Sequence, residues 1–349
     1  MKKIEQLKSY PYLNEIKKKL WENKVSVMVG AEFSKNATKE YTTVPEIPNW
    51  PQLGNIFAKE MYSDINNSIK DPIKLAEEYE SIFGRAKLEN LMIKSIPDKG
   101  YIPNEIFENF LKLPWNDVFT TNYDTLLERA SDNIYNKKYD IVEKIEQIPY
   151  SRKPRIIKLH GSFETVTPFI ITEEDYRTYP KKFAPFVNTV QQSLLENDFC
   201  LIGFSGDDPN FKSWIGWIRD NLGEYKANIY LIGIFEFSEP ELRRLEKLNL
   251  RIIDFSELFE AAESDKYNKI INTFIDFLEK GESESLLKWR GDSFIINKKD
   301  LKTTLALLEK ERESYPNWVI ANNSIRNSFI QQIEELWEIF FDKDFLHKV

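Results

Sequence analysis

The 349-residue chain is 42% hydrophobic and 14% aromatic, a composition that excludes a disordered protein and allows one large or two ordinary domains. Its formal net charge of −8, with lysine and arginine scattered along the sequence, disfavours direct binding to nucleic acid. No apolar run reaches the roughly 18 residues of a membrane span, and the N-terminus lacks a signal-peptide core. The single cysteine, Cys200, excludes internal disulfides and a cysteine-rich zinc cluster. We therefore expect a soluble cytoplasmic protein without membrane contact.

Apolar periodicity predicts alternating helices and strands over the first 280 residues. Helical spacing up to about residue 23 is followed by a β-branched strand at 25–29, which stops at Gly30. Residues 36–51 are rich in proline and other turn formers, and we expect a loop there. Further helices are predicted at residues 52–62, 73–83, 104–113, 125–134, 185–196, 210–222, 239–248 and 267–278. Further strands are predicted at residues 115–121, 156–160, 168–172, 199–203, 228–234 and 251–255.

The predicted strands are apolar on both faces and alternate with helices, which is typical of a parallel sheet covered by helices. We therefore predict an α/β fold class: a Rossmann-like parallel sheet flanked by helices, with inserted helices and a C-terminal helical appendage. Residues 281–285 (Gly-Glu-Ser-Glu-Ser) read as a linker, and charged helical patterns follow at 301–313 and 324–341. This predicts one domain at 1–280 and a linker with a helical appendage at 281–349. The apolar end of the appendage either folds back, docks on a partner or meets a continuation of the chain.

Four short motifs follow predicted strands, at the carboxyl ends where open parallel sheets bind ligands. They are Gly-Ala-Glu-Phe-Ser at 30–34, Thr-Thr-Asn-Tyr-Asp at 120–124, Lys-Leu-His-Gly at 158–161 and Gly-Phe-Ser-Gly-Asp-Asp at 203–208. Small residues after the first strand let backbone N–H groups approach a phosphate closely, although an ordinary tight turn has the same composition. Asn122 offers both a donor and an acceptor, whereas Asp124 suits either a ligand contact or the N-cap of the next helix.

The third motif contains His160, the only histidine in the body of the chain, because His347 lies at its C-terminal end. A histidine where a buried strand gives way to a loop suits acid–base catalysis, and a hydrogen-bonded structural histidine is the alternative. In the fourth motif, Ser205 and Asp207 suit hydrogen bonds to a ribose. One of Asp207 and Asp208 is expected to cap the following helix instead.

In this order, the four motifs resemble the sirtuin-like NAD-binding domain, in particular the bacterial branch whose members hydrolyse NAD during antiphage defence. The resemblance spans roughly residues 20–280. It implies that NAD+ is the substrate, that Asn122 positions the ribose and a water molecule, and that His160 is the general base. It also implies contacts to NAD at Gly30, Ala31, Phe33, Ser34, Thr121, Asp124, Gly203, Ser205 and Asp207.

An enzyme of this kind releases nicotinamide and ADP-ribose, and unregulated NAD hydrolysis is lethal to a cell. The resemblance therefore implies a gate, either homo-oligomerisation or an activating protein partner. The C-terminal helices are the candidate contact surface for that gate. Packing of these helices on their own domain is the alternative.

Two departures from the family pattern bear on function. Glu32 stands where the usual turn has a glycine, so either the loop turns Glu32 away, or NAD binds weakly until activation, or NAD binding is lost. Residues 162–180 hold no cysteine, so the four-cysteine zinc module of sirtuin deacylases is absent, and we expect no zinc and no other metal site. This absence disfavours deacylation. The alternative to a hydrolase is a non-catalytic sirtuin-like module that binds NAD or ADP-ribose as a sensor or assembly platform.

Overall fold

The computed structural model describes part of the chain, and of residues 282–290 it describes the backbone only. The described residues are 3–62, 71–135, 137–165, 169–204, 228–235, 237–247, 250–259 and 266–290. The chain divides into two units, Met1–Leu278 and Glu279–Val349. The architecture that follows is that of the first unit.

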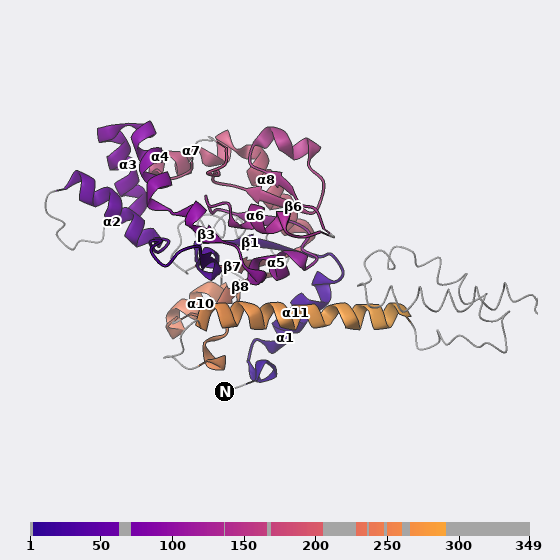
Figure 1. Cartoon of the computed structure of the whole chain (residues 1–349). Helices are drawn as coiled ribbons and strands as arrows, with labels where there is room; N and C mark the ends of the chain where they lie inside the picture. Colours follow the sequence, from indigo (N-terminus) through magenta and orange to yellow (C-terminus); the bar gives the residue numbers. More distant parts are fainter. Residues whose placement is uncertain are drawn as a thin grey trace, which may run out of the picture. The chain divides into compact units, whose positions relative to one another are not determined.

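Seven parallel strands form the central sheet of the described residues, in the order β5-β6-β4-β1-β7-β8-β9 (Figure 1). This confirms the predicted α/β fold class with a parallel sheet. The strands are β1 (Val25–Val29), β4 (Val118–Thr120), β5 (Asp140–Val142), β6 (Arg155–Lys158), β7 (Asp198–Ile202), β8 (Ile229–Gly233) and β9 (Leu250–Asp254). A separate antiparallel pair joins β2 (Thr38–Lys39) to β3 (Tyr101–Ile102).

Helices surround the sheet and fill the connections between its strands (Figure 1). The α-helices in the described part of the chain are α1 (Tyr10–Leu20), α2 (Trp50–Met61), α3 (Pro72–Phe83), α4 (Arg85–Ser95), α5 (Glu105–Lys112), α6 (Leu126–Asp132), α7 (Glu173–Lys182), α8 (Ala184–Glu196), α10 (Glu239–Lys247) and α11 (Lys266–Arg290). The 3-10 helices are η1 (Ile4–Gln6), η2 (Ala31–Asn36), η3 (Asp98–Gly100), η4 (Ile145–Tyr150) and η5 (Ser256–Leu258).

The sheet separates two hydrophobic clusters, because side chains of a strand alternate between its two faces. In β1, Val25, Val27 and Val29 join the cluster that includes residues of α1, α5, α6 and α11. Met28 points the other way and joins the cluster that includes residues of α8 and α10. All five residues of β1 are buried. Burial on both faces explains why the strands read as continuous apolar runs in the sequence.

A third hydrophobic cluster holds together the helical insertion formed by α2, α3 and α4. Phe169 and Ile171, from the segment after β6, pack on this cluster. Arg85, the first residue of α4, ties the insertion to α7 through a 2.7 Å ion pair with Asp175, and its guanidinium also donates to the Phe169 carbonyl. The segment that follows β6 is therefore fixed by contacts with the insertion.

The direction of strand addition reverses at β1. The chain passes from β1 to β4 on one side of it and later returns with β7 on the other side. Open parallel sheets bind ligands at the carboxyl ends of the strands beside such a reversal. The residues that follow the neighbouring strands β6, β4, β1 and β7 are therefore the place to look for a site.

One predicted strand, at residues 168–172, is wrong, since the described residues 169–172 form no strand. Ile170 N–H donates to the His160 carbonyl (3.2 Å), outside any ladder of the sheet. The side chain of Ile170 packs in the second cluster and that of Ile171 in the third. The apolar run thus serves two different cores, and that requirement produces a strand-like sequence without a strand.

Some elements were not predicted, namely β5, the β2–β3 pair and α4. The helix α4 buries only Leu88 and Met92, so its apolar periodicity is weak. The helix α11 continues to Arg290 through residues 281–285, where composition predicts a linker. The predicted helices at 210–222, 301–313 and 324–341 lie outside the described residues.

Candidate active site

Two glycines allow the ends of β1 and β7 to make direct backbone contact. The Gly30 N–H donates to the Ile202 carbonyl (2.8 Å), and the Glu32 N–H donates to the Gly203 carbonyl (3.1 Å). A Cβ atom at Gly30 would lie 2.5 Å from the Gly203 carbonyl oxygen. At Gly203, where φ is +78°, a Cβ atom would lie 2.7 Å from the Phe33 nitrogen. Both positions therefore require glycine.

The remainder of the first motif forms the turn η2, whose amides are used within the protein. The Phe33 N–H donates to the Gly30 carbonyl (3.1 Å), so the amides of Gly30, Glu32 and Phe33 all bind main-chain carbonyls. The Phe33 ring is fully buried against two phenylalanines of α5, and Ala31 is exposed. The side chain of Phe33 therefore belongs to the hydrophobic core, and only its backbone lies at the turn.

Glu32 lies at the partly exposed side of η2. Its side chain is 38% exposed, and Oε1 lies 3.9 Å from Lys35 Nζ. Burial raises the pKa of the Tyr267 hydroxyl on α11, and the nearby Glu32 carboxylate adds to that rise. Glu32 thus has Lys35 and α11 as neighbours. This placement favours the alternative in which the loop turns Glu32 away.

A buried chain of hydrogen bonds joins the first and second motifs. The Asn122 side chain donates from Nδ2 to the Gly30 carbonyl (3.1 Å) and to Ser34 Oγ (3.0 Å). Ser34 Oγ donates in turn to Asp124 Oδ2 (2.7 Å). Because the single hydroxyl hydrogen of Ser34 goes to the carboxylate, its oxygen is an acceptor for Asn122. The Gly30 carbonyl and the Ser34 hydroxyl, which the carboxylate orients, together determine which end of the Asn122 amide is nitrogen.

This orientation leaves the Asn122 side-chain oxygen as a buried acceptor without a partner among the described residues. Asn122 is 7% exposed and follows β4, where Thr120 Oγ1 accepts from the Asn122 N–H (3.0 Å) and donates to the Val29 carbonyl (2.9 Å). Thr121, which lies between Thr120 and Asn122 in the sequence, is 6% exposed. Since buried polar atoms nearly always have partners, this acceptor at a strand end is available to a ligand or to an ordered water molecule.

Asp124 performs both of the tasks that its position allows. Its Oδ1 accepts from the Leu126 N–H (3.2 Å) at the start of α6, while its Oδ2 accepts from Ser34. Burial raises the pKa of the Asp124 carboxyl, and the positive charge of Lys158 opposes that rise. Asp124 is therefore both a helix-capping residue and the end of the hydrogen-bond chain to Asn122.

His160 lies beside Asn122 in the register of the sheet. Thr120 of β4 pairs with Lys158 of β6. Asn122 comes two positions after Thr120, and His160 comes two positions after Lys158. The His160 side chain is buried, and its ring meets Tyr176 and Tyr179 of α7 edge-on, with centroids 5.6 and 5.4 Å away.

The imidazole of His160 is held in its neutral form. Burial lowers the pKa of His160 to about 3, and the more distant Asp175 carboxylate only partly opposes this. Its Nδ1 is a second buried polar atom that lacks a partner in the described protein. A neutral ring has one nitrogen that accepts a hydrogen bond, so His160 can accept from a water molecule or a hydroxyl group at physiological pH.

Sequence reasoning missed Lys158, which reads as a polar interruption of an apolar strand. Its side chain is 1% exposed, its Nζ lies 2.7 Å from Glu128 Oε1, and it donates to the main-chain carbonyl of Asp124. Fully buried lysines are rare unless they are paired. A lysine inside a strand that is apolar on both faces was the signal that could have identified this network.

Two predicted ligand residues, Ser205 and Asp207, lie outside the described residues.

Within the described part of the chain, no group of three or more His, Cys, Asp or Glu side chains is placed to hold a metal ion. No helix among the residues that the structure describes is both long and apolar enough to cross a membrane. Cys200 is buried in β7, and burial raises the pKa of its thiol.

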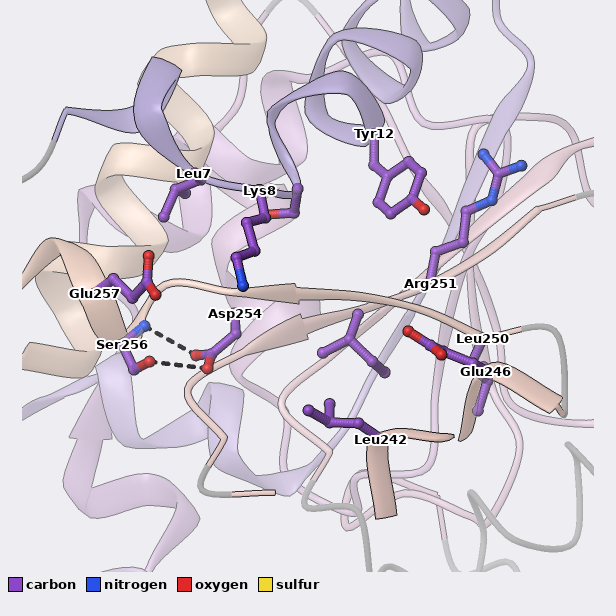
Figure 2. Close-up of a pocket in the computed structure, with 12 residues that line it drawn as sticks. Leu7, Lys8, Tyr12, Leu242, Glu246, Leu250, Arg251, Asp254, Ser256 and Glu257 are labelled. Carbon is purple, nitrogen blue, oxygen red and sulfur yellow. Dashed lines mark hydrogen bonds between the residues drawn. The ribbon is translucent and has the colours of Figure 1, made fainter. Parts of the chain in front are cut away.

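A separate pocket of about 550 Å³ lies along β9, away from these residues (Figure 2). Lys8 and Tyr12 line it from the N-terminal segment and α1, and Leu242 and Glu246 line it from α10. A smaller pocket of about 230 Å³ includes Leu159, Gly161 and Ile170 near the end of β6. Neither lining contains Asn122 or His160, so the candidate site is defined by the strand ends and not by these pockets.

The sequence is similar to proteins of known family. Residues 116–253 match the family described as SIR2-like domain. NAD(+) hydrolase ThsA of Acinetobacter baumannii is 31% identical over 224 residues, which cover 63% of this chain and 44% of that protein. NAD(+) hydrolase ThsA of Bacillus cereus is 24% identical over 271 residues, which cover 74% of this chain and 55% of that protein. The chain therefore spans about half the length of these curated relatives.

The structure also aligns with a crystal structure described as a complex of a Sir2 homologue with NAD. That alignment has a TM-score of 0.46 and 14% sequence identity, and it covers 76% of this chain and 94% of the other.

Proposed function

We propose that this chain, which is similar to the SIR2-like domain family over residues 116–253, is an NAD+ glycohydrolase that releases nicotinamide and ADP-ribose. The observation that carries the proposal is that two of the buried polar atoms without a hydrogen-bond partner among the described residues, Asn122 Oδ1 and His160 Nδ1, follow neighbouring strands. These strands lie beside the reversal of strand order. The two relatives named NAD(+) hydrolase support the same activity.

The reaction requires stabilisation of a sugar cation and delivery of a water molecule. The nicotinamide ring of NAD+ is cationic, so it leaves as a neutral molecule with the electron pair of the broken glycosidic bond, and the ribose becomes oxocarbenium-like. Asn122 Oδ1 accepts a hydrogen bond from a ribose hydroxyl or from the attacking water. As the water oxygen bonds to the sugar carbon, its proton passes to His160, directly or through a ribose hydroxyl, and then to solvent.

The His160 ring stays neutral throughout the physiological range, so one of its nitrogens is available to accept a hydrogen bond from the attacking water or from a ribose hydroxyl. No deprotonation has to precede catalysis. Asn122 keeps its orientation through Ser34 and Asp124, so its amide oxygen faces the ligand position before NAD+ arrives.

We further propose that the protein is a gated cytoplasmic effector of bacterial antiphage defence that acts by NAD depletion, because constant NAD hydrolysis would harm the host. The proposed gate is a homo-oligomer or an activating protein partner that contacts the C-terminal helices at 301–313 and 324–341. Those helices lie outside the described residues. The proposed reaction uses no zinc, and the proposal includes no contact with membrane or nucleic acid.

Incubation of the purified protein with NAD+, alone and with an activating extract, tests the proposal, with nicotinamide and ADP-ribose followed by chromatography. Asn122→Ala and His160→Ala should each lower the rate by about a hundredfold or more, as is usual for a general base or an electrostatic contact in the transition state. Asn133→Ala, at an exposed position at the end of α6, is the matched control. Wild-type rates in both site variants would contradict the assignment.

The alternative is a non-catalytic module that binds NAD or ADP-ribose. Titration calorimetry with NAD+ and with ADP-ribose separates the two functions, because a sensor binds NAD+ without releasing nicotinamide. Saturable binding with no nicotinamide release under any condition would favour the sensor.

A further inference from the structure

A buried lysine contacts the turn that carries the proposed catalytic asparagine. Lys158 is in β6, the neighbour of β4 in the sheet, and only 1% of its side chain is exposed. Its Nζ contacts two groups of the segment that follows β4: the main-chain carbonyl of Asp124 and the carboxylate of Glu128 in α6, at 2.7 Å. Burial of a lysine is costly unless its ammonium group is paired, so this arrangement needs an explanation beyond packing.

We propose that Lys158, together with Glu128, is a positioning residue that sets the orientation of the Asn122 amide through Asp124 and Ser34. This inference rests on the proposed function, because Asn122 is the group that would contact the ribose.

The first part of the argument is mechanical. The turn between β4 and α6 carries Asn122, and Lys158 holds it by the Asp124 carbonyl. The carboxylate of Asp98 fixes the next residue, since it accepts from the Thr125 N–H and from Thr125 Oγ1, both at 2.8 Å. Lys158 and Asp98 thus hold the two sides of one peptide linkage, and the turn has little freedom to move relative to β6.

The second part is electrostatic. Three carboxyl groups lie around this turn: Asp98 on η3, Asp124 after β4 and Glu128 on α6. Arg129 pairs with Asp98 at 3.2 Å, and Lys99 is 4.0 Å from the same carboxylate. Lys158 is the cation that faces the other two. Removal of its charge would leave Asp124 and Glu128 buried together, where one carboxyl would take up a proton.

The charge of Asp124 matters because it sets the direction of the hydrogen-bond chain. An ionised Asp124 only accepts, so Ser34 donates to it and accepts from Asn122 Nδ2. A protonated Asp124 can donate to Ser34 instead, which frees the Ser34 hydrogen to point at the Asn122 oxygen. The Gly30 carbonyl alone would then hold the Asn122 amide in its present orientation. Lys158 therefore maintains, through Asp124 and Ser34, a second constraint that keeps the Asn122 oxygen on the side of the sugar.

The test compares Lys158→Met with the wild-type protein in NAD+ hydrolysis over a range of pH. Met fills similar volume without charge, so we expect kcat to fall about tenfold or more while KM changes less than about threefold, because the amide acts mainly in the transition state. Loss of the positive charge raises the pKa of Asp124, so the acid limb of the kcat profile should move to higher pH. A purely structural role would lower the amount of folded enzyme and leave that limb in place.

Two further variants control for the loss of a buried lysine. In Lys158→Met/Glu128→Leu the unpaired carboxylate is removed as well, which should restore folding but not kcat or the acid limb. Lys137→Met is the matched control, because Lys137 donates to the Leu111 carbonyl (2.9 Å) and also to that of Leu113, far from any carboxylate of the site. A folded double variant with wild-type kcat and acid limb would overturn the proposal.

A second readout does not depend on hydrolysis. The Asn122 side-chain NH2 signal in a nitrogen-15 NMR spectrum, assigned by its loss in Asn122→Asp, should shift and exchange faster with solvent in Lys158→Met. If the wild-type protein releases no nicotinamide but this signal responds, the proposed function fails and the positioning role stands. An unchanged Asn122 signal in folded Lys158→Met refutes the positioning role, whatever the activity.

Discussion

The neutral His160 should make the stability of the folded protein depend on pH. In the folded state burial lowers the pKa of His160 to about 3, whereas the ordinary value for histidine is 6.5. Between these two values the unfolded chain binds a proton that the folded chain does not. The stabilising contribution of the neutral ring is therefore complete above pH 6.5, and it is lost progressively as the pH falls toward 3.

The size of the effect follows from the gap between the two pKa values. Each pH unit within this window changes the free energy of unfolding by about 1.36 kcal/mol. Acidification from pH 7 to pH 5 crosses about one and a half units of the window, so it should cost about 2 kcal/mol. Because the ring is 2% exposed, screening by solvent does not diminish this value.

Urea unfolding at pH 7, 6 and 5, for the wild type and for His160→Gln, measures this contribution. Other titrating groups, including His347, are present in both proteins and cancel in the difference. We expect the stability advantage of the wild type over the variant to shrink by about 2 kcal/mol between pH 7 and pH 5. A difference that stays constant within about 0.5 kcal/mol would show that His160 titrates normally, and the argument for a neutral base would fail.

Two further substitutions test the first turn of the site. Gly203→Ala should lower the free energy of unfolding by about 3 kcal/mol or more, because the left-handed backbone costs about 1–2 kcal/mol and the new Cβ meets backbone atoms. Gly84→Ala is the control, because Gly84 has φ +83° and open space around it, and it should show only the backbone cost. Urea unfolding of both variants gives the comparison, and equal losses would contradict the close contact of β1 with β7. Glu32→Gly should change NAD+ affinity in calorimetry less than about fivefold, because a partly exposed carboxylate paired with lysine contributes roughly 0–1 kcal/mol. A gain of about tenfold or more would mean that Glu32 does repel the phosphates.

The sequence predicted the sheet well because its central strands are buried on both faces. The run at 25–29 coincides with β1, and 228–234 contains β8 with one extra residue at each end. Short or peripheral elements were harder, since β5 has three residues and pairs on one side only. The false strand at 168–172 shows the limit of periodicity, because burial in two clusters produces the same pattern as burial in a sheet.

The positions of Asn122 and His160 at strand ends were predictable, but the contacts between motifs were not. The link from Asn122 to Asp124 runs through Ser34, about ninety positions away in the sequence, and no local pattern reveals it. Lys158 was overlooked for a related reason, since its partners belong to the next strand and helix in space. For Phe33 the sequence predicts a ligand contact, because the residue lies in the first motif. Its ring instead packs in the hydrophobic core.

The central place of β1 in the sheet also affects when activity can arise during synthesis. β1 is synthesised well before β7, yet the two strands pair along the whole length of β1, from Val25 beside Asp198 to Val29 beside Ile202. A nascent chain that ends before β7 contains both Asn122 and His160, yet the turn after β1 lacks the backbone partner that shapes it. Pairing of such distant segments is slow and comes late in folding. We therefore expect chains that end before β7 to lack the proposed NAD+ hydrolysis, which would protect the cell while the protein is being made.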